Sequence, residues 1–183
     1  MALARRFRTA PERVLHPLRR KDALRALRRV GWPRTILVVC HGNICRSPFA
    51  AGILSRSLGP GGTLVDSAGF IGPGRPVPAE GHTIAARRGI DLSTHRSRFL
   101  TPDLVQAAEL IVVMEPGQRR EICGRFGRLP REVIVLGDLD PARIETREIY
   151  DPVDQPLAAF EESYARIERC ARALVEAVSQ GIR

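Results

Sequence analysis

The chain has 183 residues, 44% of them hydrophobic, which is enough for one globular core and too little for two comfortable domains. Its four cysteines show neither the density of a disulfide scaffold nor paired CxxC spacing, and its four histidines form no HExxH-like pair, so we expect reduced thiols, no metal and no cofactor. The net charge of +9 is uneven: residues 1–34 hold eleven Lys and Arg against Glu12 and Asp22, whereas residues 35–183 hold 18 basic and 18 acidic residues. The charge therefore gives no reason to expect nucleic acid as a partner of the balanced part.

Residues 1–34 are predicted to form a basic N-terminal extension. Charge interrupts every apolar run in it, so we expect neither a secretory signal nor a membrane anchor. Asp22 is a plausible N-cap, the following ALRALRRV places its leucines and valine on one side, and Gly31 ends the pattern, which predicts a short basic amphipathic helix. Two interpretations stay open: a solvated or partly disordered lead-in, or weak attachment to a membrane with anionic lipid or to an acidic partner.

Short runs rich in Val, Ile and Leu follow, bounded by Gly, Pro or charge, and each is typical of a buried strand. They are TILVVC (35–40), TLVDS (63–67), LIVVM (110–114) and EVIVLG (132–137). Helical patterns separate them at about 47–58, 78–89, 101–108 and 116–126, and a last amphipathic pattern covers about 155–180. This alternation predicts an α/β fold, with a central four-stranded parallel sheet in a three-layer α/β/α arrangement.

The stretch VVCHGNICRSP, residues 38–48, joins the first predicted strand to the helix after it. Ligands of open α/β sheets bind outside the carboxyl ends of the strands, where the N–H groups of a turn and of a helix start can converge on an anion. Gly42 and Asn43 tolerate the positive φ angles that such a turn requires, and Arg46 offers a planar fork for two phosphate oxygens. The predicted phosphate-binding residues are His41, Gly42, Asn43, Ile44, Cys45, Arg46 and Ser47.

Cys40 lies at the strand end and is expected to point into that positive turn. A thiolate there could attack the phosphorus of a phosphomonoester and form phosphocysteine, while the N–H groups and Arg46 stabilise the equatorial oxygens. Ser47 can then donate a hydrogen bond to the sulfur when it leaves. Cys40 is therefore the predicted nucleophile.

The complete pattern CHGNICRSP resembles the P-loop of the bacterial-type low-molecular-weight protein tyrosine phosphatases. This longer pattern is far more specific than a bare CX5R, and its position directly after the first strand agrees with that family. The resemblance implies that residues 35–183 form one phosphatase domain. It also implies that Asp151 in YDPVDQPLAAF, an Asp-Pro pair ahead of the last helix, protonates the leaving oxygen and later activates water.

Two further segments, VDSAG (65–69) and STHRSRFL (93–100), resemble parts of the same family. They imply a hydrogen-bond network that holds the P-loop in shape. Its members would be Asn43, Ser47, Ser67 and His95. Cys45 has two interpretations, a loop residue of little consequence or a partner in a reversible disulfide with Cys40, and the resemblance favours the second.

The chain departs from the family's pattern in the walls that would contact substrate. Val153 and Asp154 stand where many relatives carry aromatic residues after Asp-Pro, and His41 stands at a position that is usually apolar. Phe70 could supply a replacement ring, or it could simply pack against its neighbours. We therefore expect the chemistry to be intact and substrate preference to be decided at these positions.

The sequence thus predicts a phosphatase that hydrolyses phosphotyrosine in proteins, or related aryl phosphomonoesters. The resemblance implies a cytoplasmic enzyme. It also implies that its partners include autophosphorylated tyrosine kinases of polysaccharide export. One alternative is an arsenate reductase of the same fold, which would need two more cysteines near the third strand, where only Cys123 follows. The other is a non-catalytic phosphoprotein-binding module, which the intact set of Cys40, Arg46 and Asp151 disfavours.

Overall fold

A four-stranded parallel sheet forms the centre of the computed structural model, which describes residues 2–182 and the side chains of residues 12–181. Its strands are β1 (Thr35–Cys40), β2 (Leu64–Gly69), β3 (Leu110–Val113) and β4 (Val133–Val135), in the order β2-β1-β3-β4. All pairs are parallel, so the carboxyl ends of the strands meet at one edge. β4 is shorter than predicted because Leu136–Leu139 turns into a 3-10 helix. The predicted fold class is confirmed.

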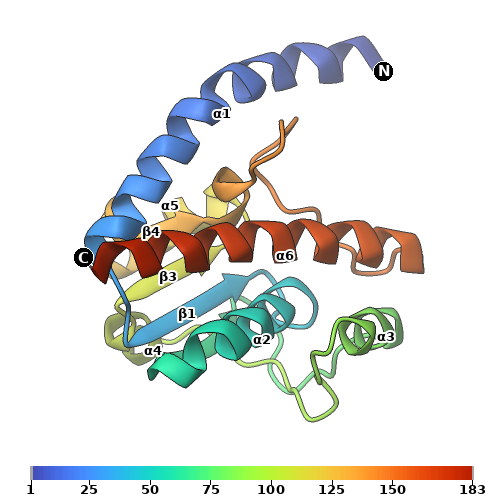
Figure 1. The fold of residues 1–183 in the computed structure, drawn as a ribbon. Coiled ribbons are helices and arrows are strands. Elements are labelled where there is room, and N and C mark those ends of the chain that lie inside the picture. Colours follow the sequence, from blue (N-terminus) through green and yellow to red (C-terminus); the bar gives the residue numbers. More distant parts are fainter. Residues whose placement is uncertain (1, 183) are drawn as a thin grey trace.

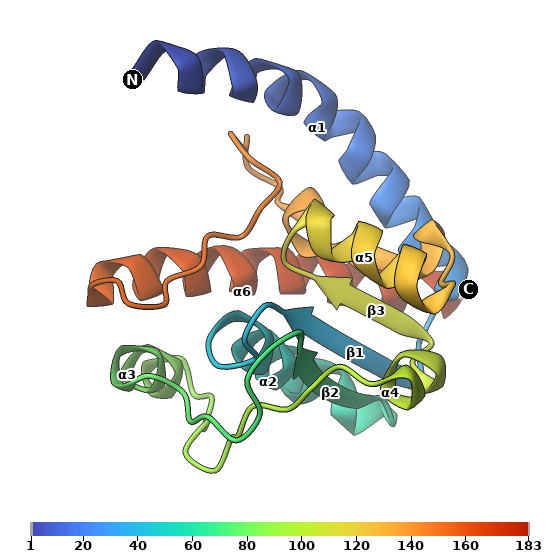
Figure 2. The ribbon, with the colours of Figure 1, turned by 180° about the vertical axis from the view of Figure 1, so that it is seen from behind.

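Helices cover both faces of the sheet (Figures 1 and 2). α2 (Arg46–Leu58) and α6 (Leu157–Ser179) lie on one face, and α4 (Pro102–Ala107) and α5 (Pro116–Phe126) lie on the other. α3 (Ala79–Arg87) packs against α6. Successive residues of a strand point to opposite faces, and accordingly Ile36 and Val38 join the apolar cluster under α2 and α6, whereas Leu37 and Val39 join the cluster under α4 and α5. Residues on both faces of β1 are therefore buried, which explains its continuous apolar run.

The amphipathic stripe predicted for the last helix is the buried face of α6. Phe160, Tyr164, Ile167 and Leu174 are among its fully buried residues. The Tyr164 ring stacks on Phe49 of α2, with ring centroids 4.0 Å apart. This contact ties the last helix to the one that follows the predicted P-loop, so the two ends of the predicted phosphatase domain meet beside that loop.

The N-terminal helix α1 (Ala2–Val30) is much longer than the short helix expected. Asp22 lies inside it and pairs with Arg25, so its prediction as an N-cap is wrong. The reason is tertiary: Leu27 is fully buried and α1 packs against α6, so contacts with the domain extend a helix that local signals would start later. Gly31 ends the helix as predicted, with φ of +68° and its N–H bonded to the Leu27 carbonyl.

Polar contacts also hold α1 on the domain. The buried His16 side chain makes a hydrogen bond through Nε2 to the carbonyl oxygen of Asp140 at 2.9 Å, and Arg20 donates to the carbonyl of Leu139 at 3.3 Å. Burial lowers the pKa of His16, although the carboxylates of Asp138 and Asp140 oppose that shift. Residues 12–30 therefore pack in part against the domain. The boundary between an extension and a phosphatase domain at residue 34 stays a prediction. Within residues 2–182, no helix is both long and apolar enough to span a bilayer.

Candidate active site

Cys40 lies at the carboxyl end of β1, at the start of the turn that leads into α2. Its Sγ accepts a hydrogen bond from the Asn43 N–H at 3.2 Å and lies 3.0 Å from the Ser47 hydroxyl oxygen. Asn43 adopts a positive φ of 51°, as expected. Gly42 does not adopt a positive φ, and a Cβ there would meet only the movable end of the Arg75 side chain, at 2.7 Å. The turn therefore encloses the sulfur.

The residues of the predicted support network lie together around Asn43. The Asn43 side-chain amide donates to the hydroxyl oxygens of Ser47 and Ser67, each at 2.9 Å. His95 Nε2 lies 2.8 Å from the Asn43 carbonyl oxygen, and the Arg98 N–H donates to Asn43 Oδ1 at 3.0 Å. Since Asn43 is fully buried, these bonds satisfy its polar atoms and hold the strained turn in one conformation.

Arg46 begins α2 and its side chain is only 2% exposed. Its Nη1 donates to Glu115 at 2.6 Å and to the carbonyl of Ile149 at 3.0 Å, and its Nη2 pairs with Asp151. Burial acts to lower the pKa of Arg46, but Cys40, Asp151 and Glu115 outweigh it and raise that pKa overall. The guanidinium therefore stays charged at the start of a helix, whose dipole also favours an anion.

Glu115 is a site residue that the sequence did not single out. It follows β3, and Gln118 fixes it by donating to Oε1 at 3.2 Å while accepting from the Met114 N–H at 2.9 Å. A carboxylate just after a strand is common, and only the tertiary contact with Arg46 distinguishes this one. No signal in the chain could have identified it.

A small cavity of about 80 Å³ opens above the Cys40 sulfur. It is lined by Cys40, His41, Gly42, Ile44, Cys45, Ile71, Arg75, Asp151 and Val153. The three predicted catalytic residues therefore meet at one place, since Arg46 pairs with Asp151 at its wall. The cavity can hold a small anion against the turn, with an apolar group between Ile44, Ile71 and Val153.

The sequence did not single out two of the cavity residues, Ile71 and Arg75, and it wrongly placed Asp154 among those that contact substrate. Ile71, not Phe70, lines the cavity, because the Phe70 ring packs into the core cluster under α4 and α5. Arg75 lies against the turn, donating to the Gly42 carbonyl at 3.2 Å and to the Gly72 carbonyl at 3.3 Å. His41 lines the cavity and is exposed, whereas Asp154 does not line it.

Cys45 is buried beside this cavity. Burial raises the pKa of its thiol, and the charges of Asp151 and Cys40 act in the same direction. The Tyr164 hydroxyl donates to the Cys45 carbonyl at 3.2 Å, which fixes the start of α2. Cys45 is therefore a neutral thiol near Cys40, and both are free cysteines.

Known proteins resemble this chain over the part that carries the site. The family model of low molecular weight phosphotyrosine protein phosphatase matches residues 35–182. EpsP of Ralstonia nicotianae, named a probable low molecular weight protein-tyrosine-phosphatase, is 40% identical over 136 residues, or 74% of this chain and 90% of its own length.

Two solved structures are similar as well. The tyrosine phosphatase AmsI of Erwinia amylovora matches with a TM-score of 0.71 and 29% identity, over 79% of this chain and 93% of its own. The YwlE arginine phosphatase of Geobacillus stearothermophilus matches with a TM-score of 0.70 and 28% identity, over 79% and 92%. The match of the family model to most of the sequence is decisive: the chain belongs to the low molecular weight phosphotyrosine protein phosphatase family.

Proposed function

We propose that this chain hydrolyses phosphotyrosine in proteins through a cysteinyl-phosphate intermediate, with Cys40 as nucleophile, Arg46 as phosphate ligand and Asp151 as general acid and base. The observation that supports the proposal best is that Cys40 and Asp151 line the same small cavity, where Asp151 pairs with Arg46. A nucleophile, a cation for the phosphate and a proton donor for the leaving group therefore face one small space.

In the first step, the Cys40 thiolate attacks phosphorus, an S–P bond forms and the bond from phosphorus to the phenolic oxygen breaks. Asp151 delivers a proton to that oxygen, so that the leaving group departs as tyrosine rather than as tyrosinate. For this, Arg46 Nη2 exchanges Asp151 for a phosphate oxygen, while Glu115 and the Ile149 carbonyl keep Nη1 in place. The N–H groups of the turn and of the first turn of α2 supply the remaining donors.

In the second step, water attacks the phosphocysteine and Asp151 removes its proton. The S–P bond breaks, inorganic phosphate is released and the sulfur leaves as a thiolate. Ser47, with its hydroxyl oxygen 3.0 Å from Sγ, and the Asn43 N–H stabilise that thiolate. The steps need no metal or other cofactor, since every charge that develops has a protein group beside it.

The cavity walls support an aryl substrate. Ile44, Ile71 and Val153 offer the apolar contacts for a ring, and His41 and Arg75 provide polar contacts beside them. The likeness to EpsP and AmsI supports phosphotyrosine, and we extend it to a tyrosine kinase of polysaccharide export as substrate and to a cytoplasmic location. The basic extension would contribute a weak contact with a membrane or with an acidic partner.

Cys45 is proposed to guard the nucleophile. Peroxide would oxidise Cys40 to a sulfenic acid, which the Cys45 thiol would convert to a disulfide with loss of water. We expect dithiothreitol to restore several-fold more activity to the peroxide-treated parent than to a Cys45→Ser variant treated alike. Equal recovery in the two proteins would argue against protection by Cys45.

The proposed function is tested with p-nitrophenyl phosphate, a phosphotyrosine peptide and a phosphoarginine peptide. We expect the parent to hydrolyse the first two at mildly acidic pH, with far less turnover of the third, and Cys40→Ser to be inactive on all. An inactive parent would favour the non-catalytic phosphoprotein-binding module. Preferential turnover of the phosphoarginine peptide would assign the chain to another substrate class.

A further inference from the structure

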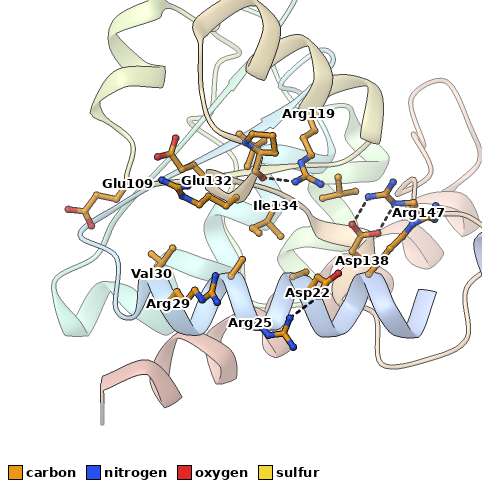
Figure 3. A pocket seen from close by; sticks show the side chains of 17 residues that line it. Asp22, Arg25, Arg29, Val30, Glu109, Arg119, Glu132, Ile134, Asp138 and Arg147 are labelled. Atoms are coloured by element: carbon orange, nitrogen blue, oxygen red, sulfur yellow. Dashed lines mark hydrogen bonds and ion pairs between the residues drawn. The ribbon is translucent and has the colours of Figure 1, made fainter. Parts of the chain in front are cut away.

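A groove of about 730 Å³ lies between α1 and the open edge of the sheet, formed by β4 (Figure 3). It shares no lining residue with the cavity above Cys40. One of its walls is α1, from Arg19 to Val30, and this helix lies outside residues 35–182 that match the family model. The groove is therefore a property of this chain and not of the family's matched domain.

α1 contacts α6 and the turns on either side of β4, and the groove lies beside these contacts. Leu27 packs into the cluster under α6, and His16 and Arg20 bond to the backbone of Asp140 and Leu139. The adjoining side of the helix, where Ala23 and Ala26 still pack at the rim of that cluster, approaches the 3-10 turn Pro130–Glu132 and borders the groove together with strand β4. β4 pairs only with β3, so α1 borders the free edge of the sheet without joining it.

Charge in the groove is not balanced locally. Six arginines and four carboxylates line it, and each carboxylate already has an arginine partner. These ion pairs are Asp22–Arg25, Glu109–Arg34, Glu132–Arg128 and Asp138–Arg147. Among residues 12–181, Arg29 and Arg131 contact no carboxylate, and the guanidinium of Arg119 bonds only to the Pro130 carbonyl, at 2.6 Å. Three guanidinium groups therefore remain available to an anion.

These three groups come from different walls. Figure 3 shows Arg29 on α1 and Arg119 on α5 on opposite sides of the groove, with Ile134 between them. Arg131 comes from the turn before β4, and both Arg29 and Arg131 are exposed. The lining also has an apolar part, with Ala23, Ala26 and Val30 from α1 and the three residues of β4. The groove therefore combines apolar surface with positive charges that come from separate walls.

We infer that this groove binds an acidic polypeptide segment in extended form. Spaced carboxylates on such a segment would pair with Arg29, Arg119 and Arg131, while small apolar residues between them would contact the floor. A flat bilayer surface cannot follow a concave groove, and a single phosphate would leave most of this lining unused. Binding here is independent of the chemistry at Cys40, so it is testable whatever the enzyme's substrate.

The test measures fluorescence anisotropy of a labelled 12-residue peptide that alternates Glu and Ala, added to the full chain at low salt. We expect Arg29→Glu combined with Arg131→Glu to weaken binding at least ten-fold. The matched control reverses two exposed arginines outside the groove, Arg87→Glu with Arg143→Glu, and should change affinity less than two-fold. Because both pairs change the net charge equally, only a local site separates them. Arg29→Gln with Arg131→Gln is measured beside them and should weaken binding by a smaller factor.

Three outcomes would overturn the inference. Equal losses in the two charge-reversed proteins would mean that the peptide senses only net charge. No binding of the peptide to the parent would remove the site. Binding of anionic vesicles, lost in the Arg29/Arg131 variant while the peptide fails to bind, would assign the surface to lipid instead.

Discussion

Arginine is used in opposite ways at the P-loop and at the α1 groove. Arg46 is almost completely buried, and its guanidinium is held by Glu115, Asp151 and a backbone carbonyl. Arg29 and Arg131 are exposed and contact no carboxylate among the described side chains. A buried charge must be paired and is thereby fixed in place, whereas an exposed one keeps its freedom and its hydration. The first arrangement suits a transition state of defined geometry, and the second suits association with a flexible partner.

The role of a fixed guanidinium is tested most strongly by replacing Arg46 with a residue that carries a point charge. In Arg46→Lys the charge is kept, but the planar fork that reaches Glu115, Ile149 and a phosphate together is lost. We expect kcat/KM for p-nitrophenyl phosphate to fall about 10³-fold, or about 4 kcal/mol of transition-state stabilisation. Arg87→Lys, on exposed α3, is the control and should stay within two-fold of the parent. A loss below ten-fold in Arg46→Lys would show that charge alone suffices.

The carboxylate paired with Arg46 provides the next test. Asp151→Asn keeps the size of the side chain but removes the proton donor, so kcat should fall by about 10² to 10³. The loss should be at least ten-fold greater for phenyl phosphate than for p-nitrophenyl phosphate, because the poorer leaving group depends more on protonation. A uniform loss for both substrates would assign Asp151 the role of positioning Arg46 instead.

The attachment of α1 is tested through its buried leucine. Leu27 is fully buried, so Leu27→Ala should lower the free energy of unfolding by about 2–4 kcal/mol in urea titrations. The specific activity of the folded protein should stay within two-fold, because α1 contributes no residue to the cavity above Cys40. A loss of stability below about 0.5 kcal/mol would mean that α1 does not pack as described, and the groove would disappear with it.

The smallest effect concerns His16, which joins α1 to Asp140. Its pKa is lowered by burial, so below its ordinary value of about 6.5 the unfolded chain binds a proton that the folded chain resists. The contribution of neutral His16 to the free energy of unfolding should therefore be fully present above that pH. It should decline as the pH falls toward the lowered pKa of the folded state. In urea titrations, the free energy of unfolding of His16→Gln should fall less than that of the parent between pH 7.5 and pH 5.5. Parallel curves would show that other groups control this pH range.

The sequence predicted best what is decided locally. The four β-branched runs became the four strands, and the turn from Cys40 to Ser47 keeps its pattern in consecutive residues, so its role could be anticipated together with that of Asn43. Glu115 and Arg75 escaped notice because their importance lies in what they contact across the fold. The length of α1 was missed for the same reason, since Leu27 is buried by a helix more than a hundred residues away. The groove, too, depends on pairs of elements that no local pattern connects.

In the proposed mechanism, the phosphoryl group is carried by the sulfur of Cys40 between the two steps. The parent and Asp151→Asn would each be allowed to turn over a phosphotyrosine peptide, and the reaction would be stopped in acid. The proteolytic peptide that carries Cys40 would then be analysed by mass spectrometry. We expect phosphate on Cys40, at a level that depends on turnover, and no phosphate on this peptide in Cys40→Ser. Phosphate on His41 or on another side chain, or active turnover by Cys40→Ser, would contradict it.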